Sequence, residues 1–321
     1  MSENSYIRLI KTNRTYRRFW LAAFVSMFGE WFNTIALFII ILKYTESELL
    51  LGILMAVRMG SFALMQPLFG LLADRVNRKK LMIVTNIFQI GLALAFIGVN
   101  GPEDMWWMFT ISGIMMALHG LYVTAERAAL PNIVSEEDLA TANALDSATW
   151  SAALCFGAFA GGLVVSEFGV NVAFIIDSIT FVFGTLMLLP LVIPQTYDKS
   201  SEGSIIKSSL NDIWLGQKRI KSEPRLLRII FAKTSWNIAG GGLAGVFLVL
   251  AGNEITFVGT ALGFGIFFFA RGIGTGLGPI LARNIFKDSS KWPKMVGLLI
   301  IVSGFFYVLV GLSLGGPILL T

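Results

Sequence analysis

A short, strongly basic segment separates two long apolar runs near the start of the chain. The segment Gly70–Lys80 reads GLLADRVNRKK and places one acid and four bases within seven residues. The run before it, residues 51–72, carries Arg58 as its one charge, and the run after it, residues 81–99, carries none. Each run is long enough to cross a bilayer as a helix, which takes roughly 20 residues. A turn this basic between two spanning helices is predicted to lie on the cytoplasmic side.

The composition excludes several classes of protein. Of the 321 residues, 55% are hydrophobic and 14% are charged, which is too apolar for an ordinary soluble domain. With one cysteine, Cys155, and one histidine, His119, the chain cannot build a disulfide framework or a His or Cys metal cluster. We therefore expect no metal and no cofactor. The sequence contains no nucleotide-binding loop and no nucleophile–base pair, so we do not expect an enzyme.

Nine apolar segments are predicted to be membrane-spanning helices. The segments alternate sides, and 22 Lys and Arg residues fall on the side of the N-terminus against one, Lys43, on the other. This asymmetry predicts a multi-pass protein of the cell membrane with a cytoplasmic N-terminus, and it explains the net charge of +5 without nucleic acid. The predicted segments are residues 20–42, 50–72, 81–99, 105–125, 144–166, 171–193, 228–250, 257–280 and 295–314.

The predicted helices fall into two bundles. Residues 1–194 are expected to form an N-terminal six-helix bundle. Residues 195–226, rich in Ser, Lys and Arg, are expected to form a cytoplasmic linker that could carry a surface helix around Leu210 to Ile220. Residues 227–321 would then form an incomplete second bundle of three helices.

Ionisable side chains inside spanning helices are costly and are therefore functional candidates. Glu30 is predicted near the middle of the first helix, where a carboxylate could take up and release protons or contact substrate. Asn33 and Thr34 lie one turn further on and could hydrogen-bond it or a polar substrate. The alternative is a structural ion pair between Glu30 and Arg58.

Three more intramembrane residues are candidates for the same cavity. Arg58 and Arg271 lie in equivalent helices of the two halves and could pair with Glu30 or with an anionic substrate. Arg271 could instead extend to the lipid headgroups. Asp177, in the sixth segment, is expected to face the cavity, with a helix-start acid as the alternative. His119 could relay protons, although a lone histidine in a helical bundle is more often a packed, hydrogen-bonded residue.

The residues after the fourth segment are candidates for conformational gating. Arg127, at the membrane edge, could pair with Asp74 and hold two helix ends together, or it could contact substrate. Such a pair would break and re-form as the two halves move. Ser135 followed by Asp138 is typical of a helix N-cap and predicts a short surface helix. In the fifth segment, Gly157, Gly161 and Gly162 are predicted to let another helix approach closely.

The basic turn resembles the loop signature of the major facilitator superfamily, G-x-x-x-D-R-x-G-R-[KR]-[KR]. Asn77 replaces the second glycine, and because asparagine tolerates positive φ we expect the sharp turn to survive this change. The fifth segment is similar to the exporter signature G-P-x-x-G-G, with Ala158 in place of the proline that would kink the helix. The residues that match the loop signature are Gly70, Asp74, Arg75, Arg78, Lys79 and Lys80.

The chain also resembles macrolide-efflux-like drug:proton antiporters in GEWFNTIAL, in ERAALPNIV followed by ATANAL, and in AFIIDSITF. The resemblance implies an all-α membrane bundle with about nine of twelve helices, the last three being absent from the sequence. It implies proton-driven export of amphipathic small molecules by alternating access, with a monomer favoured. Export of a siderophore or a lipid, uptake or facilitated diffusion by the same fold, and a non-transporting remnant are the alternatives.

Overall fold

The computed structural model describes residues 5–45, 47–195, 205–236, 248–252, 259–285 and 292–313. In these residues the secondary structure is helical, without β-strands. Seven of the described helical spans are long and apolar enough to cross a membrane. The predicted all-α class is confirmed. The predicted span 228–250 lies partly outside the described residues.

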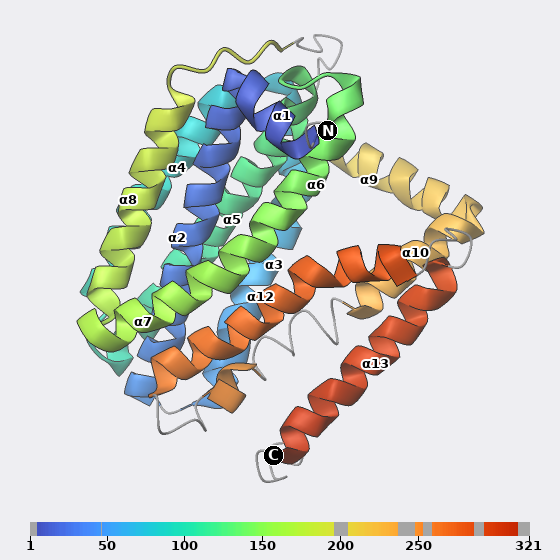
Figure 1. Ribbon diagram of the computed structural model, residues 1–321. Helices are drawn as coiled ribbons and strands as arrows, with labels where there is room; N and C mark the ends of the chain where they lie inside the picture. Colours follow the sequence, from blue (N-terminus) through green and yellow to red (C-terminus); the bar gives the residue numbers. More distant parts are fainter. Residues whose placement is uncertain are drawn as a thin grey trace.

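Six of the spans form one bundle, and its elements lie side by side in Figure 1. Within the bundle, α2 packs mainly against α8, and α3 packs mainly against α5. A short helix, α1 (Ser5–Thr12), precedes them. The six spans are α2 (Arg14–Thr45), α3 (Glu48–Arg75), α4 (Arg78–Ala95) with its 3-10 extension η1 (Phe96–Gly98), α5 (Met105–Ala129), the run from α6 (Glu136–Ala152) to α7 (Ala158–Phe168), and α8 (Val170–Leu188).

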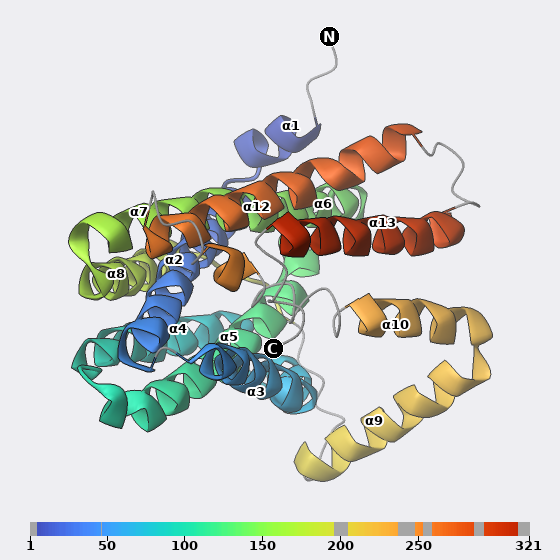
Figure 2. The same cartoon turned by 90° about the horizontal axis from the view of Figure 1, so that it is seen from below.

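Four further helices follow the bundle: α9 (Ile205–Ser222), α10 (Pro224–Trp236), α12 (Thr260–Ile285) and α13 (Trp292–Ser313). The predicted linker helix is therefore present as α9. Helix α12 packs along α7, whereas α9, α10 and α13 extend to one side of the bundle in Figure 1 and in Figure 2.

The helix after the fourth span differs from its prediction. Ser135 caps α6 by accepting a hydrogen bond from the Asp138 amide, as predicted. The helix does not stop as a short surface helix, because residues 136–152 contain no glycine or proline to end it. It continues through one π-helical turn, Ala153–Gly157, into α7 and forms a single span of 33 residues. The backbone is thus irregular just before Ala158, although the proline of the exporter signature is missing.

The bundle reverses the usual distribution of polarity. Large apolar side chains are exposed on the outer helices α4 and α8, among them Ile87, Phe88 and Ile179. Polar side chains such as Asn86 and Gln89 are buried instead. A water-soluble domain does the opposite with most of its polar side chains. The outer surface of α4 and α8 is therefore suited to contact with lipid.

The basic residues gather at one end of the bundle. We call this end the basic face: α2, α4 and α6 begin there, and α3, α5 and α8 end there. Ten of the twelve Lys and Arg residues within 5–195 lie at this face, while Lys43 lies at the opposite end and Arg58 lies in the interior. Segregation of bases to one end is typical of a membrane-spanning bundle.

Two glycines of the fifth span allow α2 to approach. A Cβ atom added to Gly157 would lie 3.1 Å from the backbone oxygen of Phe28. A Cβ added to Gly161 would lie 3.2 Å from the Cα of Phe32. Both distances are short for van der Waals contact with a backbone, so these positions favour glycine.

A second set of glycines brings α12 close to the fifth span, at α7 and at the π-helical turn before it. A Cβ on Gly162 would lie 2.5 Å from the carbonyl oxygen of Ala261, and a Cβ on Gly272 would lie 2.5 Å from the Cα of Cys155. Backbone atoms cannot move aside as a flexible side chain can, so close packing of these helices depends on glycine.

Two neighbouring glycines of α12 provide a test of this packing. Gly272→Ala should separate α12 from Cys155 and destabilise the protein by about 1–3 kcal/mol, the usual cost of overpacking. Gly274→Ala should be neutral or stabilise by up to about 1 kcal/mol, because an added Cβ there meets no described atom within 4 Å. Thermal unfolding followed by tryptophan fluorescence measures both. Equal melting temperatures for the two variants would contradict the packing.

Candidate functional site

An ion pair lies in the middle of the bundle. Arg58, on α3, has a side chain that is 4% exposed. Its guanidinium donates hydrogen bonds to Glu30 Oε1, Thr34 Oγ1 and Ser112 Oγ, each at 3.3 Å. Glu30 and Thr34 come from α2 and Ser112 from α5, so one buried cation connects three helices. The ion pair between Glu30 and Arg58 that the sequence analysis gave as an alternative is therefore present.

Two further titratable groups adjoin this pair. His119 Nε2, on α5, lies 3.6 Å from Glu30 Oε2. Asp177, on α8, is fully buried, and the amide of Asn33 on α2 lies close enough to interact with its carboxylate. Electrostatic interactions link Asp177 to both Glu30 and Arg58. We call Glu30, Arg58, His119 and Asp177 the charge cluster.

The charge cluster holds one more acid than permanent base. With both carboxylates ionised and His119 neutral, its net charge would be −1 inside an apolar bundle. An uncompensated charge there is costly. One added positive charge would balance the cluster, which makes it a candidate site for a proton or another cation.

Asn33 and Arg271, the other two candidates for the cavity, take different positions. Asn33 is buried beside Asp177 of the charge cluster, and its amide nitrogen lies 3.8 Å from the sulfur of Met115. Arg271 is half-buried on α12 and forms no ion pair with any described residue. Of the possibilities considered for Arg271, a pair with Glu30 is not formed: that carboxylate is held by Arg58 and lies beside His119.

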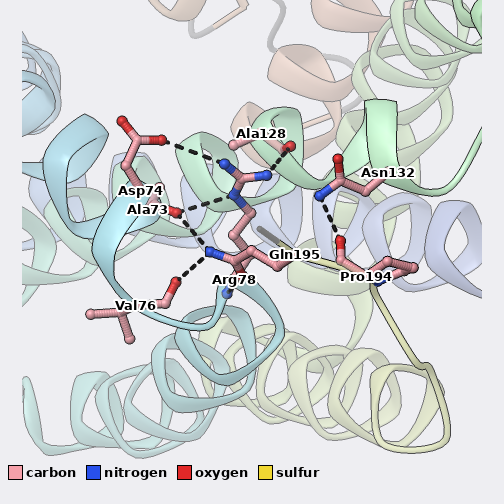
Figure 3. Close-up of polar contacts among 8 residues, drawn as sticks. All are labelled: Ala73, Asp74, Val76, Arg78, Ala128, Asn132, Pro194 and Gln195. Atoms are coloured by element: carbon pink, nitrogen blue, oxygen red, sulfur yellow. Dashed lines mark hydrogen bonds and ion pairs between the residues drawn. The ribbon is translucent and has the colours of Figure 1, made fainter. Parts of the chain in front are cut away.

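At the basic face, Arg78 joins the ends of two helices, as Figure 3 shows. Its Nε donates to the carbonyl of Ala73 at 3.1 Å, near the end of α3. Its Nη1 donates to the carbonyl of Ala128 at 2.8 Å, near the end of α5. The last carbonyls of a helix lack intrahelical partners and carry partial negative charge. A guanidinium is well suited to satisfy two of them at once.

The predicted partner of Asp74 is wrong. Asp74 pairs with Arg78, one helical turn away, at 3.4 Å, and its side chain is 62% exposed. Arg127 instead lines a cavity between α2, α5 and α6. The guanidinium of Arg78, on α4, reaches both helix ends. An exposed pair such as Asp74–Arg78 adds little stability, so the carbonyl contacts of Arg78 carry most of the connection.

The turn itself also differs from expectation. Asn77 has φ −59°, so the position needs no left-handed backbone. Its side chain caps α4 by accepting a hydrogen bond from the Lys80 amide at 3.0 Å, which explains how asparagine can stand in place of glycine. Gly70 lies within α3, where an added Cβ meets no described atom within 4 Å, and Arg75 is the last residue of that helix.

Two residues at this face were missed by the sequence analysis (Figure 3). Gln195 Oε1 accepts from the Arg78 amide at 2.9 Å, and its Nε2 donates to the carbonyl of Val76 at 3.1 Å. Asn132 Nδ2 donates to the carbonyl of Pro194 at 2.6 Å. The segment that leaves α8 is thereby fastened to the turn. In the sequence, Gln195 could have been noticed as a polar residue directly after the sixth apolar segment. The backbone groups at the ends of nearby helices lack intrahelical partners and need such a residue.

Removal of Gln195 should expose the start of α4. In a Gln195→Ala variant the Arg78 amide loses its acceptor, so its hydrogen exchange should become severalfold faster. Exchange measured by mass spectrometry on peptides covering residues 76–80 checks this. Val192→Ala, an exposed change in the same segment, is the matched control. Unchanged exchange at the turn would show that Gln195 does not hold it.

These features define a class of protein. A helical bundle with apolar side chains outside, ionisable groups inside and bases at one end is a multi-pass membrane protein, and buried ionisable groups of this kind mark transport pathways. The family model for the Major Facilitator Superfamily matches residues 19–321, and the chain belongs to this superfamily.

Several relatives are named as transporters. The chain is 26% identical over 208 residues to YfiS of Bacillus subtilis (strain 168), an uncharacterized MFS-type transporter, which is 63% of this chain and 48% of YfiS. It is 25% identical over 240 residues to YkuC of the same strain, another uncharacterized MFS-type transporter; the match covers 72% of this chain and 55% of YkuC. It is 29% identical over 169 residues to the enterobactin exporter EntS of Shigella boydii serotype 4 (strain Sb227); the match covers 51% of this chain and 40% of EntS. The chain spans about half the length of these relatives.

Proposed function

We propose that the protein exports amphipathic small molecules, among them drugs of the macrolide type, and that inward proton flow drives the export. The observation that carries the proposal is the charge cluster, in which Asp177 is an additional buried carboxylate beside the Glu30–Arg58 pair. The similarity to an exporter supports the outward direction of transport. In this proposal the basic face is cytoplasmic, as the distribution of bases favours.

The mechanism needs a protonation that affects two conformations unequally. A proton bound by the charge cluster cancels its excess negative charge. Arg58 then connects α2, α3 and α5, and the neighbouring Asp177 on α8 no longer adds an unbalanced negative charge. Loss of the proton leaves Asp177 charged in a fully buried position, which favours a conformation that lets water or another cation reach it. Alternation between these states exposes the substrate first to one side of the membrane and then to the other.

A siderophore is the second candidate substrate, because one relative is named as an enterobactin exporter. Transport assays in proteoliposomes with a siderophore and with a macrolide distinguish the two candidates.

Changing Glu30 tests proton coupling. Glu30→Gln keeps the shape of the side chain but removes the counter-charge of Arg58. Efflux of a fluorescent amphiphile driven by a pH gradient should fall at least tenfold in proteoliposomes. The protein should also lose stability, by less than the about 3–5 kcal/mol typical of a fully buried pair, because Glu30 is 24% exposed.

Two further variants serve as comparisons for Glu30→Gln. Glu167→Gln, an exposed change at the end of α7, should transport normally. Asp177→Asn should be at least as stable as the unmodified protein, because it removes a fully buried carboxylate that forms no ion pair with a described base, yet its transport should no longer respond to the pH gradient. Normal gradient-driven efflux in the Glu30 variant would exclude Glu30 from coupling.

Arg78 and Asp74 should differ in their importance for gating. Arg78→Lys cannot span the carbonyls of Ala73 and Ala128 at once, so the maximal transport rate should fall severalfold with little change in apparent substrate affinity. Asp74→Asn should have a smaller effect, because its pair with Arg78 is exposed. Rates measured over a range of substrate concentrations separate the two quantities. A defect confined to affinity would contradict the gating role.

A further inference from the structure

We propose that a small cavity inside the bundle binds an ordered water molecule, and that this water passes protons between His119 and Glu126; this inference rests on the proposed proton-driven export. The cavity has a volume of about 10 Å³ and is lined by residues of α2, α4, α5 and α8. A volume of about 10–15 Å³ is the least that holds one water molecule. The lining residues that matter here are Ser26, Asn86, Gln89, His119, Tyr122 and Glu126.

The walls of this cavity carry polar atoms that need a partner. Asn86, on α4, is fully buried, and neither its amide nitrogen nor its amide oxygen has a hydrogen-bond partner among the described residues. The hydroxyl oxygen of Ser26, on α2, is also buried and finds no partner in the same part of the chain. Unsatisfied polar atoms in an apolar bundle are costly. Water both donates and accepts hydrogen bonds, and it is small enough to satisfy atoms of both kinds here.

A glycine of α8 keeps this space open. A Cβ atom added to Gly184 would lie 2.7 Å from Ser26 Oγ and 3.2 Å from Asn86 Nδ2. The backbone of Gly184 is that of an ordinary α-helix, so it is the space and not the conformation that favours glycine. The two polar groups without partners thus face one point of α8 at which a larger residue would intrude on them.

The cavity also connects two titratable groups of α5. His119, Tyr122 and Glu126 all line it, and their spacing of three and four residues places them on one face of the helix. His119 and Glu126 are about 10 Å apart along the axis, whereas a hydrogen bond spans about 3 Å. A proton therefore needs intermediate groups to pass between them. A water molecule and the hydroxyl groups of Ser26 and Tyr122 can each accept one proton and donate another.

The path continues at both of its ends. His119 Nε2 lies 3.6 Å from Glu30 Oε2, so this end adjoins the charge cluster. Glu126 also lines the larger cavity of about 340 Å³ between α2, α5 and α6. The exposed side chains of Asn143 and Ser147 line that cavity too, so solvent at the basic face can reach it. Among the described residues, Glu126 is the one titratable group that lines both cavities.

Charged and titratable groups surround both ends of the path. His119 faces Glu30, and Arg58 and Asp177 complete the charge cluster behind it. In the transfer step, the imidazolium of His119 gives its proton to the water while the water gives one of its own to the carboxylate of Glu126. Only N–H and O–H bonds change, and Glu126 then releases the proton to the basic face. The groups that interact electrostatically with Glu126 are Tyr16, Tyr122, Arg127 and Asp146.

Radical labelling tests the water site. A brief X-ray pulse converts bound water into hydroxyl radicals, which oxidise the side chains beside it, and mass spectrometry of the purified full chain identifies them. Tyr122, which is 5% exposed, should be oxidised. Met108, fully buried on the same helix, does not line the cavity and should stay unmodified. Gly184→Ala should lower the labelling of Tyr122 severalfold, because the added Cβ occupies the space. An unlabelled Tyr122 in the unmodified protein would overturn the water site.

Transport in two modes tests the proton path in proteoliposomes. Efflux of a fluorescent amphiphile driven by a pH gradient requires proton release at the basic face, whereas exchange of labelled for unlabelled amphiphile does not. Ser26→Ala, Gly184→Ala and Glu126→Gln should slow gradient-driven efflux severalfold and exchange much less. The matched control is Ser178→Ala, because Ser178 is a buried serine outside the cavity whose Oγ donates to the carbonyl of Ile90. If Gly184→Ala fails to fold, Ser26→Ala still provides the test.

The outcomes separate this inference from the proposed function. Gradient-driven efflux that Ser26→Ala and Glu126→Gln leave unchanged, or that falls in equal measure with exchange, would overturn the proton path and keep the export proposal. Exchange in the unmodified protein without any response to the pH gradient would overturn proton-driven export and the path that depends on it. The labelling of Tyr122 decides on the water site in either case.

Discussion

A guanidinium buried among apolar helices has to find its counter-charge and its hydrogen-bond acceptors within the protein. Arg58 does so with Glu30, Thr34 and Ser112. These contacts reach α2 and α5 from α3, so the position of one cation sets how three helices of the bundle are arranged. Removing any partner would leave a desolvated charge unsatisfied, which costs far more than the contact itself contributes. The remaining polar groups of the interior are arranged around this constraint.

The helices that hold Arg58 also end at the basic turn. Helix α3 carries Arg58 and ends beside the Ala73 carbonyl, and α5 carries Ser112 and ends beside the Ala128 carbonyl. Arg78 binds both carbonyls. From Arg58 to Ala73 the distance along the helix is about 22 Å at 1.5 Å per residue. A tilt of α3 against α5 caused by a changed charge near Arg58 would therefore strain the contacts at the turn. This gives a physical route between proton binding and gating.

Most of the fold could be predicted because its signals are local. The lengths of the apolar runs predicted the membrane spans, and Ser135 predicted the start of a helix. The ion pair of Glu30 with Arg58 could be named as an alternative from the sequence, because both charges lie in the interiors of consecutive helices. The contacts of Arg78 and Gln195 could not be foreseen, because the choice of donor for a helix-end carbonyl depends on how the helices pack. The partner of Arg271 could not be predicted for a similar reason, since the position of a residue along a helix does not reveal which way its side chain faces.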